Sequence, residues 1–478
     1  METHVDYFIH LIIAIYGGSL AAWYLVLAII SLIEMREYLK KNSLVDYNTI
    51  LSSPSAPGIS LVAPAYNESR TIIDNVKSLL SITYNNFEVI VVNDGSTDDS
   101  IAQLQKIFDL EKVNEIHQQP LATQKVKAIY RSRNKAFERL LIIDKQNGGK
   151  ADALNVGLNF ASNELVACID VDCIIEPDAL LRMVKPFLED NLVIASGGVV
   201  RIANSCVVED GRLVKVKLPS QLLPRFQVLE YLRAFLLGRM AWSKLNGLLL
   251  ISGAFGLFKR NVAVQCGGYN ANTVGEDMEF VVRMRKYMHE QGHPYRVAYI
   301  PDPLCWTEVP KNNAQFGRQR NRWARGTFET LWLNRKLFFN KRYGLMGLVS
   351  YPFWFFYEWL SPFIETGGLI YFGAMLALGK FNWTYFLFLF ITIHAFVFLI
   401  SALAIFAEES TYHKYTLRRE VLKLIGIALL EPLVLHPRVI YWSIRGNIDF
   451  WRGKKSWGEM KREGFATTET VQAKLSLS

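Results

Sequence analysis

Cysteine is scarce in this chain, and its few cysteines follow no pattern. The 478 residues include five cysteines, with no Cys-x-x-Cys pair and no nearby histidines to complete a metal site: Cys168, Cys173, Cys206, Cys266 and Cys305. This spacing gives no support for a zinc module or a disulfide framework, and we expect free, mostly buried thiols. Internal repeats are also absent, and biased composition is limited to a Ser/Pro-rich linker at 52–58.

Lysine and arginine are absent before the first long apolar stretch, residues 8–33. That stretch is uncharged and longer than the ~20 residues that a membrane-spanning helix needs. Its length also argues against a cleavable signal peptide, so residues 1–40 are expected to be a retained anchor. Arg36, Lys40 and Lys41 follow the stretch. This asymmetry predicts an outside N-terminus and a cytosolic domain after the anchor.

The C-terminal part is apolar but interrupted. Residues 385–407 form a second clear span, and the aromatic stretch 344–379 is expected to cross at least once despite its prolines and glutamates. Charged residues and prolines in the middle of 422–442 favour a broken, interfacial or re-entrant segment. The sequence thus predicts a membrane region at 344–445 with about three crossings in all, and a basic cytosolic tail at 446–478.

The net charge of +9 does not require a nucleic acid partner. Lysines and arginines close to the predicted spans are explained by anionic membrane lipid. The expected location is therefore a plasma (bacterial inner) membrane, crossed several times, with the catalytic domain in the cytosol.

Between the apolar regions, short β-rich runs alternate with helical periodicity. This alternation predicts an α/β domain with a parallel sheet, covering about 55–340. Strands are expected at 59–63, 87–93, 125–132, 140–144 and 165–169, with helices from Ile72 to Leu80, at 150–161 and at 278–289.

Two further segments, 220–246 and 315–339, combine helical periodicity with interspersed basic residues. We expect membrane-interface helices here. Ordinary helices packed on the sheet are the alternative.

Acidic residues follow several predicted strands, at the sheet edge where open α/β folds bind ligands. Asp94 can accept hydrogen bonds from a uracil or ribose, although a lone aspartate there is more often a turn residue. Asp170 and Asp172 can address a ribose and a hard cation such as Mg²⁺ or Mn²⁺. An isolated Asp-x-Asp is nevertheless common in surface loops.

Other motifs supply groups that a transfer from a nucleoside-diphosphate sugar needs. Lys150, in Asn-Gly-Gly-Lys at a helix start, favours an anion such as a diphosphate, although a solvated lysine is as common. The small residues 252–256 offer a floor for a sugar, or simply a buried strand and turn. Asp277 is a candidate general base, although acidic residues often only cap a helix.

The segment Gln319-Arg-Asn-Arg322-Trp323 combines a phosphate-binding side chain with a flat aromatic surface for a sugar. A basic amphipathic helix alone would explain the arginines. It would not require Trp323 beside Arg322.

In this order, the motifs resemble those of family 2 glycosyltransferases of the membrane-bound processive polysaccharide-synthase type. That group includes poly-N-acetylglucosamine, hyaluronan, chitin and cellulose synthases. The resemblance covers roughly 59–339, and combined motifs are far more specific than any one of them. It implies a GT-A type domain and an inverting reaction.

The resemblance also implies a role for each matching residue. It makes Asp277 the catalytic base and assigns the metal to Asp172 and Asp170. The donor nucleotide would contact Ala65, Tyr66, Glu68, Asp94, Lys150, Asp170, Gln319 and Arg322. The acceptor would be bordered by Ser252, Gly253, Glu276 and Trp323.

The expected activity is transfer from a UDP-sugar, with N-acetylglucosamine as the donor sugar by family analogy, to a growing polysaccharide or oligosaccharide. Addition of one sugar to a lipid or lipid-linked acceptor is the main alternative, and a transporter or catalytically silent scaffold is a more distant one. Two departures from the family pattern stand out: a long basic loop between Asp109 and Asp144, and few membrane crossings. The second predicts an accessory subunit, a homo-oligomer or a short product.

Overall fold

The computed structural model describes residues 4–454, apart from 116–117, 210 and 416. These residues form two compact units, each assembled from separate stretches of chain. The sheet unit comprises residues 40–220 and 248–309, and the helical unit comprises 4–39, 221–247 and 310–454. The expected tail at 446–478 lies outside the described residues from 455 onward.

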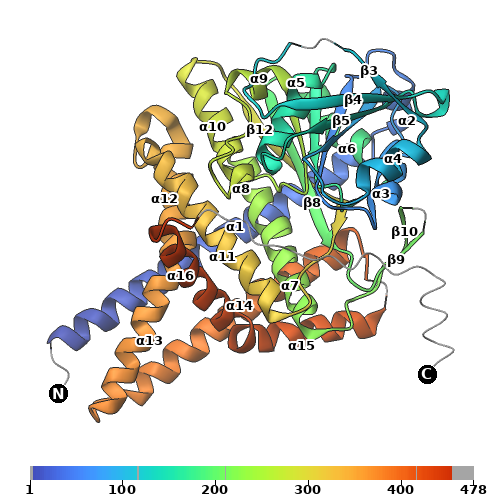
Figure 1. The fold of residues 1–478 in the computed structure, drawn as a ribbon. Helices are drawn as coiled ribbons and strands as arrows, with labels where there is room; N and C mark the ends of the chain where they lie inside the picture. Colours follow the sequence, from blue (N-terminus) through green and yellow to red (C-terminus); the bar gives the residue numbers. More distant parts are fainter. Residues whose placement is uncertain (1–3, 116–117, 210, 416, 455–478) are drawn as a thin grey trace. The chain divides into compact units, whose positions relative to one another are not determined.

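The described part of the sheet unit contains a ten-stranded sheet in the order β3-β4-β5-β2-β1-β6-β11-β8-β12-β7. Strands β9 and β10 form a separate pair (Figure 1). The strands are β1 (Ile59–Ala65), β2 (Phe87–Asn93), β3 (Leu110–Val113), β4 (Val126–Ser132), β5 (Leu140–Lys145), β6 (Leu165–Ile169), β7 (Ile174–Ile175), β8 (Val193–Ile202), β9 (Val207–Glu209), β10 (Arg212–Lys215), β11 (Phe255–Lys259) and β12 (Arg296–Thr307). The five strands expected from sequence are present within two residues at either end.

The sheet is mixed, which corrects the expectation of a parallel sheet. Strands β5, β2, β1 and β6 run parallel, as do β8 and β12. By contrast, β4 pairs antiparallel with β5, and β11 runs antiparallel between β6 and β8. The short 133–139 connection permits an antiparallel pair. Strand β11 follows an excursion of the chain into the helical unit, so no local βαβ crossover fixes its direction.

The sheet unit also contains α2 (Tyr47–Ser52), α3 (Ile72–Leu80), α4 (Ser100–Ile107), the 3₁₀ turn η1 (Lys135–Phe137), α5 (Lys150–Phe160), α6 (Ala179–Glu189), α9 (Arg260–Gln265) and α10 (Glu276–Glu290). Apolar side chains of β1 and β2 are buried, as expected for strands covered on both faces. Helix α5 packs on these two strands. This packing fixes the start of α5 at the carboxyl end of the sheet.

Close contact between α5 and β1 depends on Gly157. A Cβ atom at Gly157 would lie 2.1 Å from Cγ1 of Val62. We therefore expect Gly157→Ala to destabilise the folded chain by about 1–3 kcal/mol, the usual range for overpacking a core. Thermal unfolding of the detergent-solubilised protein measures the effect. The double variant Gly157→Ala/Val62→Ala should recover much of the lost stability, because it removes the side chain that the new Cβ would meet. A Gly157→Ala protein as stable as the unaltered chain would contradict the prediction.

The helical unit is built from α1 (His4–Asn42), α7 (Leu222–Leu232), the π-helix η2 (Arg233–Arg239), α8 (Met240–Lys244), α11 (Asn313–Leu333), η3 (Arg335–Leu337), η4 (Lys341–Tyr343), η5 (Met346–Ser350), α12 (Tyr351–Phe353), η6 (Trp354–Trp359), α13 (Ser361–Ala377), α14 (Trp383–Thr411), α15 (Arg418–Val434) and α16 (His436–Trp451). Three stretches of the described chain, Asp6–Asn42, Met346–Ala377 and Trp383–Thr411, are long and apolar enough to cross a membrane. Helices α15 and α16 meet at a 46° bend, and they make a fourth candidate if they count as one broken span. The bend lies within 422–442, where a broken, interfacial or re-entrant segment is expected.

Both predicted interface segments are helical. The 220–246 segment forms α7, η2 and α8, joined through the π-helical turns, and Arg233 of this segment makes a bidentate ion pair with Glu431 of α15. Helix α11 ends at Leu333, six residues before the expected end at 339. A 3₁₀ turn follows, and Phe339 adopts a left-handed backbone conformation with φ of 51°, which no helix can continue through.

Candidate active site

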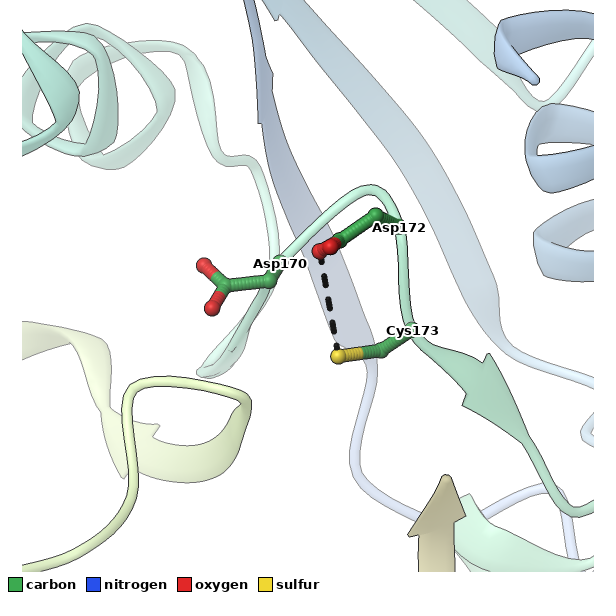
Figure 2. Close-up of side chains that lie close together, drawn as sticks. All are labelled: Asp170, Asp172 and Cys173. Carbon is green, nitrogen blue, oxygen red and sulfur yellow. Dashed lines mark hydrogen bonds between the residues drawn. The ribbon is translucent and has the colours of Figure 1, made fainter. Parts of the chain in front are cut away.

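The turn that follows β6 presents two carboxylates. Asp170, Asp172 and Cys173 lie on this turn between β6 and β7 (Figure 2), where the amide of Cys173 donates to the carbonyl of Asp170 at 3.0 Å. One potential ligand atom from each of the three side chains lies within 4.8 Å of the others. The turn therefore brings together the two aspartates predicted to bind a metal.

The chemistry of this group suits a hard divalent cation. Carboxylate oxygens are the ligands preferred by Mg²⁺ and Mn²⁺, and Mg²⁺ usually retains waters and substrate phosphates as further ligands. Hydrogen bonding with Cys305 and burial raise the pKa of the Cys173 thiol well above its usual value. A thiol is also a poor partner for a hard cation, so the two aspartates are the residues that fit a metal.

Lys150 connects this turn to the start of α10. Lys150 is the first residue of α5, and its ammonium forms an ion pair with Asp170. The same Nζ lies 3.7 Å from Oε1 of Glu276 and donates to the carbonyl of Gly253 at 3.5 Å. Burial alone would lower the pKa of Lys150, but the neighbouring Asp170, Glu276 and Asp277 carboxylates outweigh burial and raise it. Lys150 is therefore a fixed positive charge among carboxylates.

Asp277, the expected base, is oriented by two backbone amides. Gly253 donates to its Oδ2 at 3.2 Å and Met278 to its Oδ1 at 2.8 Å. A Cβ at Gly253 would lie 3.1 Å from the Lys150 Nζ and 3.5 Å from the Asp277 Cβ. A larger residue at position 253 would therefore crowd the end of the Lys150 side chain, while its contact with Asp277 would have an ordinary length. Ser252 and Gly253 precede β11, so the alternative of a turn leading into a strand is also realised here.

The residues after β1 form a turn that is tied to the segment after β2. The amide of Asp94 donates to the carbonyl of Ala65 at 2.9 Å, and the amide of Glu68 donates to the Ser100 hydroxyl at 3.2 Å. Tyr66 is half exposed. Ala65 thus lies beside Asp94, and Glu68 lies beside Ser100 at the start of α4.

Asp94 is buried and holds the loop before Lys150. Its Oδ1 accepts hydrogen bonds from the Gly148 amide at 2.9 Å and from Lys145, and its Oδ2 accepts from the Gly149 amide at 2.8 Å and the Asn147 side chain at 3.2 Å. A carboxylate has about four acceptor positions. A uracil would therefore replace one of these donors on binding Asp94, and that contact stays a prediction.

Gln319, Arg322 and Trp323 lie on α11 in the helical unit. Gln319 is buried, Arg322 is partly buried and Trp323 is 38% exposed. Arg320 stacks over the Trp323 ring at 4.3 Å and makes a bidentate ion pair with Glu230. The tryptophan therefore keeps an accessible surface while the neighbouring arginine orients it.

Sequence reasoning missed Lys145 and Asp152, which join Asp94 in a buried ion cluster. Lys145 Nζ lies 2.6 Å from Oδ2 of Asp152 and also pairs with Asp94. One signal was available: four apolar residues begin strand β5, and the strand ends in Asp144 and Lys145 just before the glycine loop. A charged residue in such a place needs buried partners.

With this geometry established, the relatives of the chain can be compared. Residues 57–326 match the family described as glycosyltransferase like family 2. Poly-beta-1,6-N-acetyl-D-glucosamine synthase of Staphylococcus aureus is 32% identical over 277 residues, which are 57% of this chain and 55% of that protein. The same enzyme of Staphylococcus epidermidis is 30% identical over 275 residues. The chain thus spans about half the length of the curated relatives it matches.

Two solved structures are also similar. The mannosyltransferase PcManGT from Pyrobaculum calidifontis, in complex with GDP-Man and Mn²⁺, aligns with a TM-score of 0.48 at 18% identity, over 91% of this chain and 99% of that chain. S. aureus TarS 1–349 aligns with a TM-score of 0.36 at 15% identity, over 86% and 100%. The family match covers more than half of the chain and includes the motifs that carried the resemblance. The chain is a member of glycosyltransferase-like family 2, with the α/β sheet core expected of a GT-A type domain.

Proposed function

We propose that this chain transfers a sugar, with N-acetylglucosamine as the favoured donor group, from a UDP-sugar to a growing polysaccharide. The observation that carries the proposal is the arrangement around Lys150. Its ammonium pairs with Asp170 and lies near Glu276, and both this ammonium and the Asp277 carboxylate contact the backbone of Gly253. A positive group for a diphosphate thus lies beside a carboxylate for an acceptor.

Binding of the donor would use the carboxylate turn and the lysine. Asp172 and Asp170 would hold Mg²⁺ or Mn²⁺, and such an ion supplies charge stabilisation to a departing diphosphate. Lys150, at the N-terminus of α5, would bind the diphosphate, and the helix end favours the same negative charge. We propose that Gln319 and Arg322 of α11 add further diphosphate contacts.

Transfer would need one base and no protein nucleophile. Asp277 would accept the proton of the acceptor hydroxyl, which then displaces UDP in a single step at the anomeric carbon and inverts its configuration. The amides of Gly253 and Met278 keep the Asp277 carboxylate oriented, so its acceptance of the proton requires no rearrangement. Trp323 and Glu276 would border the acceptor.

We propose that the sheet unit lies in the cytosol. The absence of basic residues before the first span and their presence after it favour this orientation in a bacterial inner membrane. Because so few crossings are available, we propose that export of a long product involves an accessory subunit or a homo-oligomer.

The test is UDP release by purified membranes with several UDP-sugars, with Mg²⁺, with Mn²⁺ and with a chelator. We expect release to be greatest with UDP-N-acetylglucosamine, to depend on the metal, and to accompany a ladder of lengthening products. A single added sugar on extracted lipid would instead identify a lipid-directed transferase. No UDP release with any donor would overturn the proposal.

A further inference from the structure

A buried cluster of three charges lies directly behind the glycine loop. Lys145, the last residue of β5, is fully buried, and its ammonium contacts Asp94 and Asp152, which are also buried. The same ammonium donates to the carbonyl of Gln146 at 2.7 Å. Because it is shielded from solvent, Lys145 has no direct access to a substrate.

One carboxylate of the cluster holds the loop, and the other ties the start of α5 to the segment before β4. Asp94 accepts the amides of Gly148 and Gly149, and Asp152 in the first turn of α5 accepts the amide of Gln124 at 3.0 Å. The loop is closely enclosed: a Cβ at Gly148 would lie 2.5 Å from the Asp152 carboxylate. Gly149 has φ of 86°, a conformation that favours glycine. These contacts leave the loop a single path into α5.

Electrostatics explain why a cation is needed at this position. Two buried carboxylates near one another repel strongly, and removal of a shared cation leaves uncompensated buried charge. Without the ammonium, Asp94 or Asp152 would have to turn away or take up a proton. Either change withdraws an acceptor that the loop amides or the Gln124 amide now use.

The loop ends at Lys150, the residue that faces the transfer site. Gly149 is the N-cap of α5 and Lys150 is its first residue, so displacement of the glycine amides moves the lysine backbone directly. A misplacement of about 1 Å in a positioning group can cost on the order of a hundredfold in rate. Lys145 and Lys150 are thus connected through the four residues between them and the Asp94 carboxylate.

We infer that Lys145 is a positioning residue for Lys150. It neutralises Asp94, which holds the 146–149 loop, and Asp152, which ties the start of α5 to the Gln124 segment, so that Lys150 is placed for the donor diphosphate. This inference deepens the proposed function and rests on it for the identity of the donor. Lys145 itself touches neither donor nor acceptor.

The chain offers a matched control. Arg182 of α6 also lies between two carboxylates, 2.7 Å from Asp178 and 2.6 Å from the buried Asp302. This cluster has no contact with the glycine loop among those described. Arg182→Met should therefore show the general destabilisation that follows when a cation is removed from a cluster of this kind.

The experiment combines two measurements on the full detergent-solubilised chain: hydrogen exchange of peptides covering 146–152, and calorimetric titration with UDP and Mn²⁺. We expect Lys145→Met to speed exchange at Gly148 and Gly149 and to weaken UDP binding about tenfold or more. Arg182→Met should change neither the exchange at Gly148 and Gly149 nor the affinity for UDP. The double variant Lys145→Met/Asp152→Asn removes one negative charge together with the cation. It should restore both slow exchange at Gly148 and Gly149 and the affinity for UDP.

A double-mutant cycle separates positioning from general destabilisation. In a Lys150→Ala background, Lys145→Met should weaken UDP binding by less than about twofold, because the residue it positions is gone. Lys145→Gln keeps a donor toward Asp94 and replaces Lys145→Met if that variant does not fold. Unchanged loop exchange in a Lys145 variant, or an equal loss of UDP affinity in both backgrounds, would overturn the inference. Exchange is measured without sugar transfer, so a chain that transfers no sugar would refute only the proposed function.

Discussion

Asp277→Asn is expected to reduce sugar transfer by about a hundredfold to ten-thousandfold, the range attributed to a positioned general base. The substitution keeps the size of the side chain and an oxygen for the amide of Gly253 or Met278, but removes the carboxylate that would accept the acceptor proton. UDP affinity should change little, because Asp277 is not a proposed diphosphate ligand. Initial rates of UDP release, together with titration of UDP, measure the two effects separately.

Glu290→Gln is the control for this substitution. Glu290 ends the same helix, α10, on its exposed side, where it lies 4.0 Å from Lys286. Exposed pairs of this kind contribute little, so the variant should keep full transfer activity. Substantial transfer by Asp277→Asn at saturating donor would show that another group takes the proton.

Asp172→Asn should lower transfer by about a hundredfold or more, since several kcal/mol of charge stabilisation depend on the metal and each 1.36 kcal/mol corresponds to a factor of ten. The variant should also need a higher Mn²⁺ concentration for half-maximal rate, because an amide is a weaker ligand than a carboxylate. Rates measured over a series of Mn²⁺ concentrations test both expectations.

Cys173→Ala provides the comparison on the same turn. The thiol lies beside Asp172 but is a poor partner for a hard cation, so its loss should leave the Mn²⁺ requirement unchanged. If Asp172→Asn kept the unaltered metal dependence, the metal would have to bind elsewhere.

Much of the candidate site could be predicted from sequence because its residues follow strands or begin helices. Asp170 and Asp172 follow a strand of five buried residues, and Lys150 begins a helix after two glycines. The ends of strands and the starts of helices can be recognised from the residues next to them in the sequence. The roles of the individual side chains stay predictions, since they depend on a bound donor.

The Lys145 cluster could not be predicted in this way because its members meet only through strand pairing. Asn93 of β2 lies opposite Asp144 of β5, and this register brings Asp94 and Lys145 together from 51 positions apart. Strand β12 escaped prediction for another reason: it contains Pro301 and Pro303, which usually indicate the absence of an inner strand. Register shifts against β8 around Pro303 accommodate them.

The discontinuity of the two units matters for anyone who wants a soluble fragment. A simple truncation to 55–340 would retain 221–247 and α11 but remove their helical partners. Arg233 would lose its ion pair with Glu431. Helix α11 would lose α16, whose Trp442 packs against Gly317. Such a fragment would expose apolar helix faces and leave an uncompensated charge. A fragment limited to the sheet unit would have to leave out 221–247 as well and combine 40–220 with 248–309.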